Sequence, residues 1–270
     1  MPNEGQIDVQ AVFREHPFAR EILRRLGGAG HDAVLIGGVV RDGLLSRWGR
    51  AVTFPPADVD IATSALPEEI RRLFPARPIV GVGEEFGVLV IVAPDGRSYE
   101  VATFRVEGGY DGRWPGRVEL VRDLAGDVRR RDLTINGLAA TLDGSVIDLV
   151  EGTLDLQSGR VRASGDPRVR FSEDLLRMLR AVRFVCQIDG HLDEATAAAI
   201  AEEAPGIATI SGERIRDELL RMLATPRSAR GVELLDQLGL LERVLPEVVL
   251  GKGVPQPETY PSRGYYRTFC

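Results

Sequence analysis

The chain has 270 residues, of which 44% are hydrophobic and 27% are charged, and this composition excludes collagen-like and mainly disordered proteins. Its two cysteines, Cys186 and Cys270, are too few for a disulfide-stabilised secreted scaffold, so we expect a cytoplasmic protein. The N-terminal residues show no secretory signal, and the longest apolar run, Val88–Ala93, is too short to span a membrane. The formal net charge of −6 does not fit a surface coated in positive charge, although a local basic patch would still bind nucleic acid.

The first half of the chain alternates short apolar runs with helical patterns, which predicts a mixed α/β domain. The expected helices span residues 19–26, 39–45 and 67–74, and the expected strands span 33–36, 58–62, 79–82, 87–92 and 99–103. Pro94-Asp95-Gly96 predicts a hairpin turn between the last two strands, and the Gly, Pro and Arg content of 110–117 predicts a mobile loop.

The second half of the chain is dominated by helical periodicity. The expected helices span 173–187, 193–203, 212–223 and 229–235. A boundary near 144–165 then divides the chain into a first domain over 1–150, a helical domain over 151–250 and a frayed tail over 251–270.

Asp58-Val59-Asp60 is the first candidate site. Carboxylates two residues apart on a strand point to one face, about 6.6–7 Å apart along the chain. That spacing suits two divalent ions about 3.5–4 Å apart. Hard oxygen ligands without a His/Cys cluster favour Mg²⁺ over zinc. By itself the pair is more often part of a solvated turn.

A glycine turn precedes this pair in the sequence. Gly37 and Gly38 follow the strand at 33–36 and precede a helix, so backbone N–H groups at the helix N-terminus would form an anion site suited to a triphosphate. The alternative for Gly-Gly alone is a tight strand–helix turn without a ligand.

Two further segments carry polar groups among apolar residues. Glu100, in the expected strand over 99–103, faces either solvent or the metal site. The run Arg129-Arg130-Arg131 is either surface charge or a group of phosphate donors. Asp132 and Asn136, four apart on an expected helix, would share a face that holds a ribose or caps a turn.

The helix beginning at Glu173 carries both acids and arginines. Glu173, Asp174, Arg177 and Arg180 fall within about 120° of arc on a regular helix. One interpretation is a solvated face with pairing of Glu173 to Arg177. The other is a protein template, in which Asp174 accepts from a base amino group and Arg177 donates to ring acceptors.

These segments, in this order, closely resemble the bacterial-type tRNA nucleotidyltransferase and poly(A) polymerase family. The resemblance runs from Val34 to Leu245. It rests on LIGGVVRD at 35–42, DVDIAT at 58–63, EVATFR at 100–105, DGRWP at 111–115, RRRDLTINGLA at 129–139, IDLVEG at 147–152, RFSEDLLRMLRAVRF at 170–184 and ISGERIRDEL at 210–219.

The resemblance implies a palm-type nucleotidyltransferase head with a mixed sheet, followed by an all-α neck. It implies that Asp58 and Asp60 hold two Mg²⁺ ions, with Glu100 as a third acidic partner. The nucleotide-binding residues that it implies are Gly37, Gly38, Arg41, Arg129, Arg131, Asp132, Asn136, Asp174, Arg177 and Arg180. It also implies that the loop at 111–115 assists the change of specificity, and that Arg214 fixes the neck against RNA or the head.

The implied activity is template-independent addition of CCA to tRNA 3′ ends from CTP and ATP. Poly(A) relatives usually carry a basic stretch where this chain has the acidic, glycine-rich residues 80–87, which favours CCA addition. Poly(A) synthesis, partial CC- or A-addition, an inactive RNA- or nucleotide-binding relative, and transfer to a small molecule remain alternatives. Family members commonly extend about 100 residues further, so tRNA affinity and oligomeric state stay open.

Overall fold

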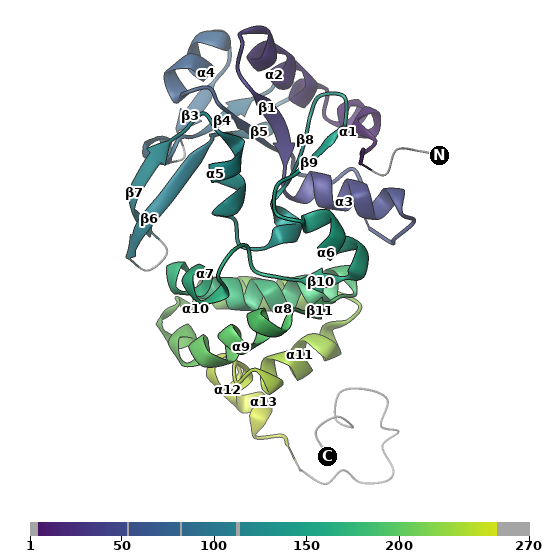
Figure 1. Ribbon diagram of the computed structural model, residues 1–270, viewed down its shortest axis with the longest axis vertical. Helices are drawn as coiled ribbons and strands as arrows, with labels where there is room; N and C mark the ends of the chain where they lie inside the picture. The colour runs from purple at the N-terminus through teal and green to yellow at the C-terminus, as the bar shows by residue number, and fades with distance from the viewer. Residues whose placement is uncertain (1–4, 53, 82, 112–113, 253–270) are drawn as a thin grey trace. The chain divides into compact units, whose positions relative to one another are not determined.

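The computed structural model describes residues 5–52, 54–81, 83–111 and 114–252, and the chain divides into two compact units (Figure 1). The first unit consists of Met1–Tyr110 with Pro115–Leu156, and the second of Asp111–Trp114 with Gln157–Cys270. Most of the tail expected over 251–270 lies outside the described residues. Within those residues no helix is both long enough and apolar enough to span a bilayer.

The first unit is built on a mixed seven-stranded sheet with the order β3-β4-β5-β2-β1-β8-β9. These strands are β1 (Ala33–Ile36), β2 (Asp60–Thr63), β3 (Ile79–Gly81), β4 (Val88–Val92), β5 (Ser98–Thr103), β8 (Leu138–Ala140) and β9 (Val146–Asp148). Its helices are α1 (Val9–Glu15), α2 (Pro17–Gly28), α3 (Gly38–Arg47), α4 (Pro67–Leu73), α5 (Leu124–Arg129) and α6 (Gly152–Ser158), with 3₁₀ turns η1 (Glu84–Phe86) and η2 (Thr134–Asn136). The expected mixed α/β class is confirmed.

Apolar residues on both faces of the sheet make the core of this unit. One face carries an apolar cluster of Val34, Ile36, Ala62, Phe104, Val128 and Ala139, to which α5 contributes Val128. On the opposite face, α2 packs on β1 and β2, and the Phe18 ring contacts Phe74 and Tyr99. Because side chains alternate along a strand, Asp60 belongs to the same face as Ala62, the face that α5 covers.

The strand expected over 58–62 is shifted in the structure. β2 begins at Asp60, so Asp58 lies in the preceding segment and the expectation that both acids sit on the strand is wrong. Val59 is nevertheless buried between two exposed residues, Asp58 and Asp60. The predicted alternation of exposed and buried side chains is therefore present, although Asp58 and Val59 are not part of the strand.

The segment 110–117 was expected to be a loop, and this is largely wrong. It belongs to a separate two-stranded sheet made of β6 (Arg105–Asp111) and β7 (Trp114–Leu120). Residues 112 and 113 of the DGRWP motif lie outside the described residues. Valine, tyrosine and tryptophan in the flanks favour strands and outweigh the local glycines.

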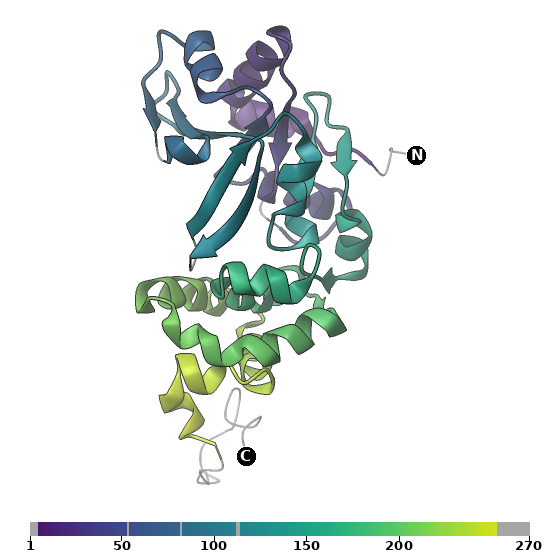
Figure 2. The same cartoon turned by 60° about the vertical axis from the view of Figure 1, so that its left-hand side comes forward.

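The second unit is mostly helical in its described residues, as Figure 2 shows. It also contains a short parallel pair, β10 (Arg160–Val161) with β11 (His191–Leu192). Its helices are α7 (Pro167–Glu173), α8 (Leu176–Ile188), α9 (Glu194–Glu203), α10 (Gly212–Leu223), α11 (Ser228–Gln237), α12 (Leu241–Val244) and α13 (Pro246–Val249), with the 3₁₀ helix η3 (Ala204–Thr209). α8 is buried along most of its length and packs against α10 and α11.

The single helix expected over 173–187 is wrong at its start. α7 ends at Glu173, Asp174 adopts an extended conformation with φ −156° and ψ 104°, and α8 begins at Leu176. An oxygen of the Asp174 carboxylate accepts from the Leu176 N–H at 3.1 Å, as a helix-capping side chain does. The four polar residues assigned to one helical face therefore lie on two helices and the break between them.

A buried ion pair joins α8 to α10. The Nε of Arg183 donates to Glu218 at 2.6 Å, and the two side chains are only 8% and 5% exposed. The Arg183 guanidinium also lies over the Phe184 ring, with its Cζ 4.2 Å from the ring centroid. Removing one partner would take the nearest opposite charge from a group that stays buried, which is costly.

We expect Glu218→Ala to lower the free energy of unfolding by about 3–5 kcal/mol, because Arg183 then remains buried without its counterion. Replacing both partners, as Arg183→Met with Glu218→Leu, should cost much less. Urea denaturation measures both. Asp217→Ala, at an exposed neighbour on α10, is the control, and an equal loss in the single and double replacements would contradict this reading of the pair.

Candidate active site

The parallel pairing of β2 with β5 brings two predicted acids together. Ile61 pairs with Val101 and Ala62 with Ala102, so the same register places Asp60, the first residue of β2, beside Glu100 of β5. On its other side, Asp60 pairs with Ile36 of β1, directly before the glycine turn. The structure thus brings Asp60, Glu100 and Gly37 into one region of the first unit.

The charges of these acids act on one another. Partial desolvation and the nearby Asp58 charge raise the pKa of Asp60, while Arg131 acts in the opposite direction. Desolvation and then the Asp60 charge raise the pKa of Glu100, and Arg105 and Arg131 oppose the rise. Both side chains keep solvent access. Like charges held this close are stabilised by a bound cation.

The glycine turn has the backbone geometry that an anion site requires. Gly37 has φ +76° and ψ −124° and precedes the first residue of α3, a conformation that side-chain-bearing residues rarely adopt. The first N–H groups of a helix have no carbonyl partner within it, and they carry partial positive charge. A Cβ added at Gly37 would lie 3.3 Å from Nη1 of Arg131, so an arginine side chain already borders the turn.

A chain of hydrogen bonds joins α3 to the segment after α5. The Nη1 of Arg41 donates to the Asn136 side chain at 2.7 Å, and the Asn136 amide donates to Asp132 at 3.1 Å. Arg41 also makes a two-pronged contact with Asp42, at 2.9 and 3.0 Å, and is only 13% exposed. Arg41 therefore orients the Asn136 side chain, in addition to any charge that it offers to a ligand.

Asp132 and Asn136 do meet, but the expectation that they share a helix is wrong. α5 ends at Arg129, and Asn136 lies at the end of the 3₁₀ turn η2. Their carboxylate–amide contact closes this turn, and both side chains are buried. Arg129, at the end of α5, has an exposed side chain.

Arg131 is the predicted arginine that borders both the acids and the glycine turn. Its Nη2 donates to Asp127 of α5 at 3.2 Å, and its charge acts on Asp60 and Glu100. The sequence analysis did not single out Asp127 as a candidate residue. Its position four residues before Arg131 was a signal for a helical ion pair, but only the fold shows that this acid is 1% exposed.

In the second unit, Asp174 is held by two groups. One carboxylate oxygen caps α8, and the other accepts from Nη2 of Arg214 on α10 at 2.6 Å. Arg214, predicted to fix the neck against RNA or the head, contacts Asp174 within the neck itself. Its contact gives the Asp174 carboxylate a fixed orientation.

The arginines of this region have different partners. Arg177 of α8 donates to Glu173 and to the Arg170 carbonyl, so it points back toward the end of α7. Arg170 also donates to Glu173, at 2.7 Å, and Glu173 therefore joins two arginines. Arg180 lies 4.0 Å from Glu218, on the side of α10. Asp174 and Arg177 stay near each other, because Arg177 donates its backbone N–H to the Asp174 carbonyl at 3.0 Å.

The donor set of the first unit fits a magnesium ion bound together with a substrate. Over the described part of the chain no group of three or more His, Cys, Asp or Glu side chains is arranged to hold a metal by itself. Mg²⁺ is usually bound by one or two carboxylates plus substrate phosphates, rather than by an all-protein cage. Asp58 and Asp60 supply such carboxylates, and the bordering glycine turn suits the phosphates.

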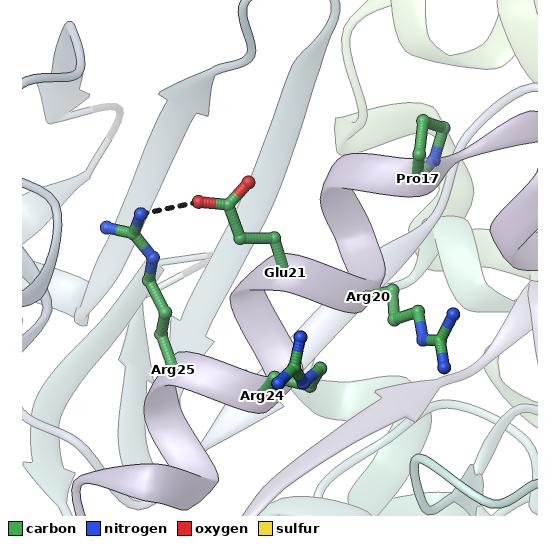
Figure 3. A pocket seen from close by; sticks show the side chains of 5 residues that line it. All are labelled: Pro17, Arg20, Glu21, Arg24 and Arg25. Carbon is green, nitrogen blue, oxygen red and sulfur yellow. Dashed lines mark ion pairs between the residues drawn. The ribbon is translucent and has the colours of Figure 1, made fainter.

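A pocket elsewhere in the first unit contains none of the candidate residues. Its lining, among the described residues, comes from α2: Pro17, Arg20, Glu21, Arg24 and Arg25 (Figure 3). Glu21 pairs with Arg25 at 2.6 Å across one turn of the helix, and both side chains are exposed. This pocket is therefore separate from the acidic region at β2 and β5.

Comparison with known proteins gives two family matches. Residues 33–162 match the poly A polymerase head domain, and residues 191–250 match a family described as the probable RNA and SrmB-binding site of polymerase A. The first match includes every candidate residue of the first unit.

Individual relatives carry one name. The CCA-adding enzyme of Enterococcus faecalis is 46% identical over 213 residues, which cover 78% of this chain and 50% of that protein. That of Lacticaseibacillus paracasei is 47% identical over 203 residues, covering 75% and 48%. The crystal structure of the Bacillus stearothermophilus CCA-adding enzyme in complex with CTP matches with a TM-score of 0.72 and 40% identity, over 84% of this chain and 52% of that one. The chain spans about half the length of these relatives.

We expect Asp60→Asn and Glu100→Gln to raise the melting temperature of the metal-free protein at neutral pH. Folding raises the pKa of both acids, so it favours their protonated forms, and their ionisation destabilises the fold. The difference from wild type should grow as the pH rises from about 4 to 7. Thermal denaturation in EDTA at several pH values measures it, with Asp95→Asn as a control in an exposed turn. Lower melting temperatures for both variants at pH 7 would contradict the expected sign.

Proposed function

Because the chain belongs to the bacterial-type tRNA nucleotidyltransferase and poly(A) polymerase family, we propose that it adds CCA to tRNA 3′ ends from CTP and ATP. The observation that carries this proposal is the register that sets Asp60 beside Glu100, next to the glycine turn. Relatives at 41–47% identity named CCA-adding enzyme support the choice over poly(A) synthesis.

In this proposal Asp58 and Asp60 hold Mg²⁺, with Glu100 as the third acidic partner. When bound, the metal lowers the pKa of the RNA 3′-hydroxyl and stabilises the departing pyrophosphate. The carboxylates themselves would fix where the hydroxyl and the α-phosphate meet, because Asp60 and Glu100 lie on neighbouring strands of the sheet. Charge neutralisation and positioning are the main contributions of the protein to nucleotidyl transfer.

The triphosphate binds at the turn before α3. The backbone N–H groups after Gly37 face the phosphates, and a Cβ at Gly37 would make a tight contact of 3.3 Å with the bordering Arg131. Arg131 supplies a full positive charge to the same phosphates. Asp132 and Asn136, oriented by Arg41, hold the ribose hydroxyls and thereby favour ribonucleotides.

Base selection belongs to the second unit. Each carboxylate oxygen of Asp174 can accept more than one hydrogen bond, so the cap to Leu176 and the Arg214 contact leave capacity for a base amino group. Arg177 donates to ring acceptors, with Glu173 fixing its guanidinium and Arg180 on the next turn adding positive charge. Cytosine and adenine both offer an amino group beside a ring nitrogen, and this shared pattern is what the pair reads.

The proposal divides the chain into a catalytic head over 1–150 and a nucleotide-selecting, RNA-binding neck over 151–250. A cytoplasmic location follows from its substrates, tRNA and nucleoside triphosphates. The proposed partners are tRNA, CTP and ATP.

We expect the purified protein with Mg²⁺ to incorporate labelled CTP and ATP into tRNA that lacks its CCA end. Asp58→Ala and Asp60→Ala should each abolish incorporation, because each removes a metal-binding carboxylate. Asp95→Asn, at an exposed hairpin turn of the same unit, is the matched control and should leave the rate unchanged. Full activity in either alanine variant would refute the metal assignment.

The same assay distinguishes the products. Sequencing tRNA 3′ ends after incubation with each nucleotide separately and together should show C-C-A and termination. A run of adenosines would assign poly(A) synthesis instead, and growth by only CC or only A would assign a partial enzyme. Nucleotide and tRNA binding without any incorporation would identify an inactive relative.

We expect Arg214→Ala to lower kcat/KM for CTP and ATP by about ten- to hundredfold, because a hydrogen bond between charged groups contributes about 1.5–3 kcal/mol. The loss should be smaller for GTP and UTP, which do not offer the same base pattern to Asp174. Arg216→Ala is the matched control on α10, because Arg216 is 63% exposed and pairs with its neighbour Asp217. An equal loss with all four nucleotides would show that Arg214 does not act through base selection.

A further inference from the structure

Arg131 is anchored by one side chain. Its Nη2 donates to Asp127, and no second hydrogen-bond acceptor for it is found among the residues that the structure describes. Its Nε is buried and has no hydrogen-bond partner there. The guanidinium is about one-fifth exposed, with a relative accessibility of 20%, so part of it can reach a ligand.

Two alternative partners for this guanidinium lie nearby. The charge of Arg131 already acts on Asp60 and on Glu100. If the bond to Asp127 were lost, attraction to these two acids would draw the guanidinium away from the glycine turn. The arginine would then neutralise carboxylates proposed to hold the metal, and the phosphates would lose a positive charge.

The contacts of Asp127 oppose this movement of the Arg131 guanidinium. The Asp127 side chain is 1% exposed, and its two oxygens have separate partners. Oδ1 accepts from Nε and Nη2 of Arg130, at 3.0 and 2.6 Å, and Oδ2 accepts from Arg131. The contact to Arg130 fixes the carboxylate, and the fixed carboxylate then holds Arg131.

Arg130 has a second anchor that Arg131 lacks. Glu107 of β6 accepts from Nη1 of Arg130 at 3.1 Å and from Arg105 at 2.5 Å, and it is only 6% exposed. Loss of the Asp127 charge would therefore leave Arg130 attached to Glu107 while it releases Arg131. Glu107 offers a comparison, because it belongs to the same charge network and is not bonded to Arg131.

We propose that Asp127 is a positioning residue for nucleotide binding: it holds the Arg131 guanidinium at the glycine turn and keeps it off Asp60 and Glu100. The inference rests on the proposed function, since it takes Arg131 as a phosphate-binding side chain. It extends that function to a buried residue that does not itself touch the nucleotide.

The test is a double-mutant cycle on nucleotide binding. The dissociation constant for CTP is measured by calorimetry in EDTA for the wild type, Asp127→Asn, Arg131→Ala and the double variant. Asparagine keeps the shape of the side chain but removes the charge and replaces one carboxylate oxygen with an NH₂ donor, so it cannot accept from Arg130 and Arg131 through two separate oxygens. Glu107→Gln is the matched control, because it removes one charge from the same network.

We expect Asp127→Asn to weaken CTP binding about tenfold, as one charge-assisted contact to phosphate is lost. In the Arg131→Ala background the same change should have no further effect, because there is no guanidinium left to position. Glu107→Gln should change the dissociation constant less than twofold, about the accuracy of one such comparison. If Asp127 had only a structural role, Asp127→Asn would weaken CTP binding equally with and without the Arg131 side chain.

Asp127→Glu serves as a second variant if Asp127→Asn is poorly folded, because it keeps the buried charge and displaces the carboxylate. Asp127→Glu should also weaken CTP binding only in the protein that keeps Arg131, and not in the Arg131→Ala variant. Equal losses with and without Arg131, or a Glu107→Gln loss as large as that of Asp127→Asn, would overturn the inference while leaving the proposed function intact. A wild-type protein that binds no CTP would overturn both.

Discussion

Two carboxylates, those of Asp60 and Glu100, lie side by side on one face of the central sheet, because β2 and β5 run parallel and in register. Desolvation makes both acids costly to ionise, and the neighbouring charges of Asp58 on Asp60 and of Asp60 on Glu100 add to that cost. An apolar cluster that includes Ile36 and Ala62 lies on the same face of the sheet as Asp60. The structure thus maintains a concentration of negative charge that a bound cation would relieve, and the neighbouring groups are arranged around this constraint.

Positive charge is placed close to these acids without cancelling them. Arg131 follows α5, the helix on the same face of the sheet, and it borders the glycine turn. Its bond to Asp127 opposes collapse onto Asp60 and Glu100. A buried acid that serves two arginines is costly to desolvate, which makes it a poor choice for stability alone. Its value lies in the fixed position that it gives to a guanidinium beside the glycine turn.

The neck uses a break between helices where the sequence suggested a continuous one. Asp174 leaves the helical conformation, caps α8 with one oxygen and receives Arg214 with the other. Glu173 orients Arg177 in a similar way, because its carboxylate accepts from both Arg177 and Arg170. Side chains that read a base need defined directions, and both candidate reading groups obtain theirs from contacts with residues on other helices or turns.

The sequence by itself determined the family, the mixed sheet followed by helices, and the positions of the acids and glycines, because these depend on local pattern and motif order. It misplaced the start of β2, the loop at 110–117 and the helix at 173–187, where capping and pairing with distant residues decide the conformation. Only the tertiary structure decided that Asp60 lies beside Glu100 and that the Asn136 side chain accepts a hydrogen bond from Arg41. It also decided that Asp127 is buried and accepts from Arg131. Each of these contacts joins separate elements, and strand register and burial are properties of the folded chain rather than of any short segment.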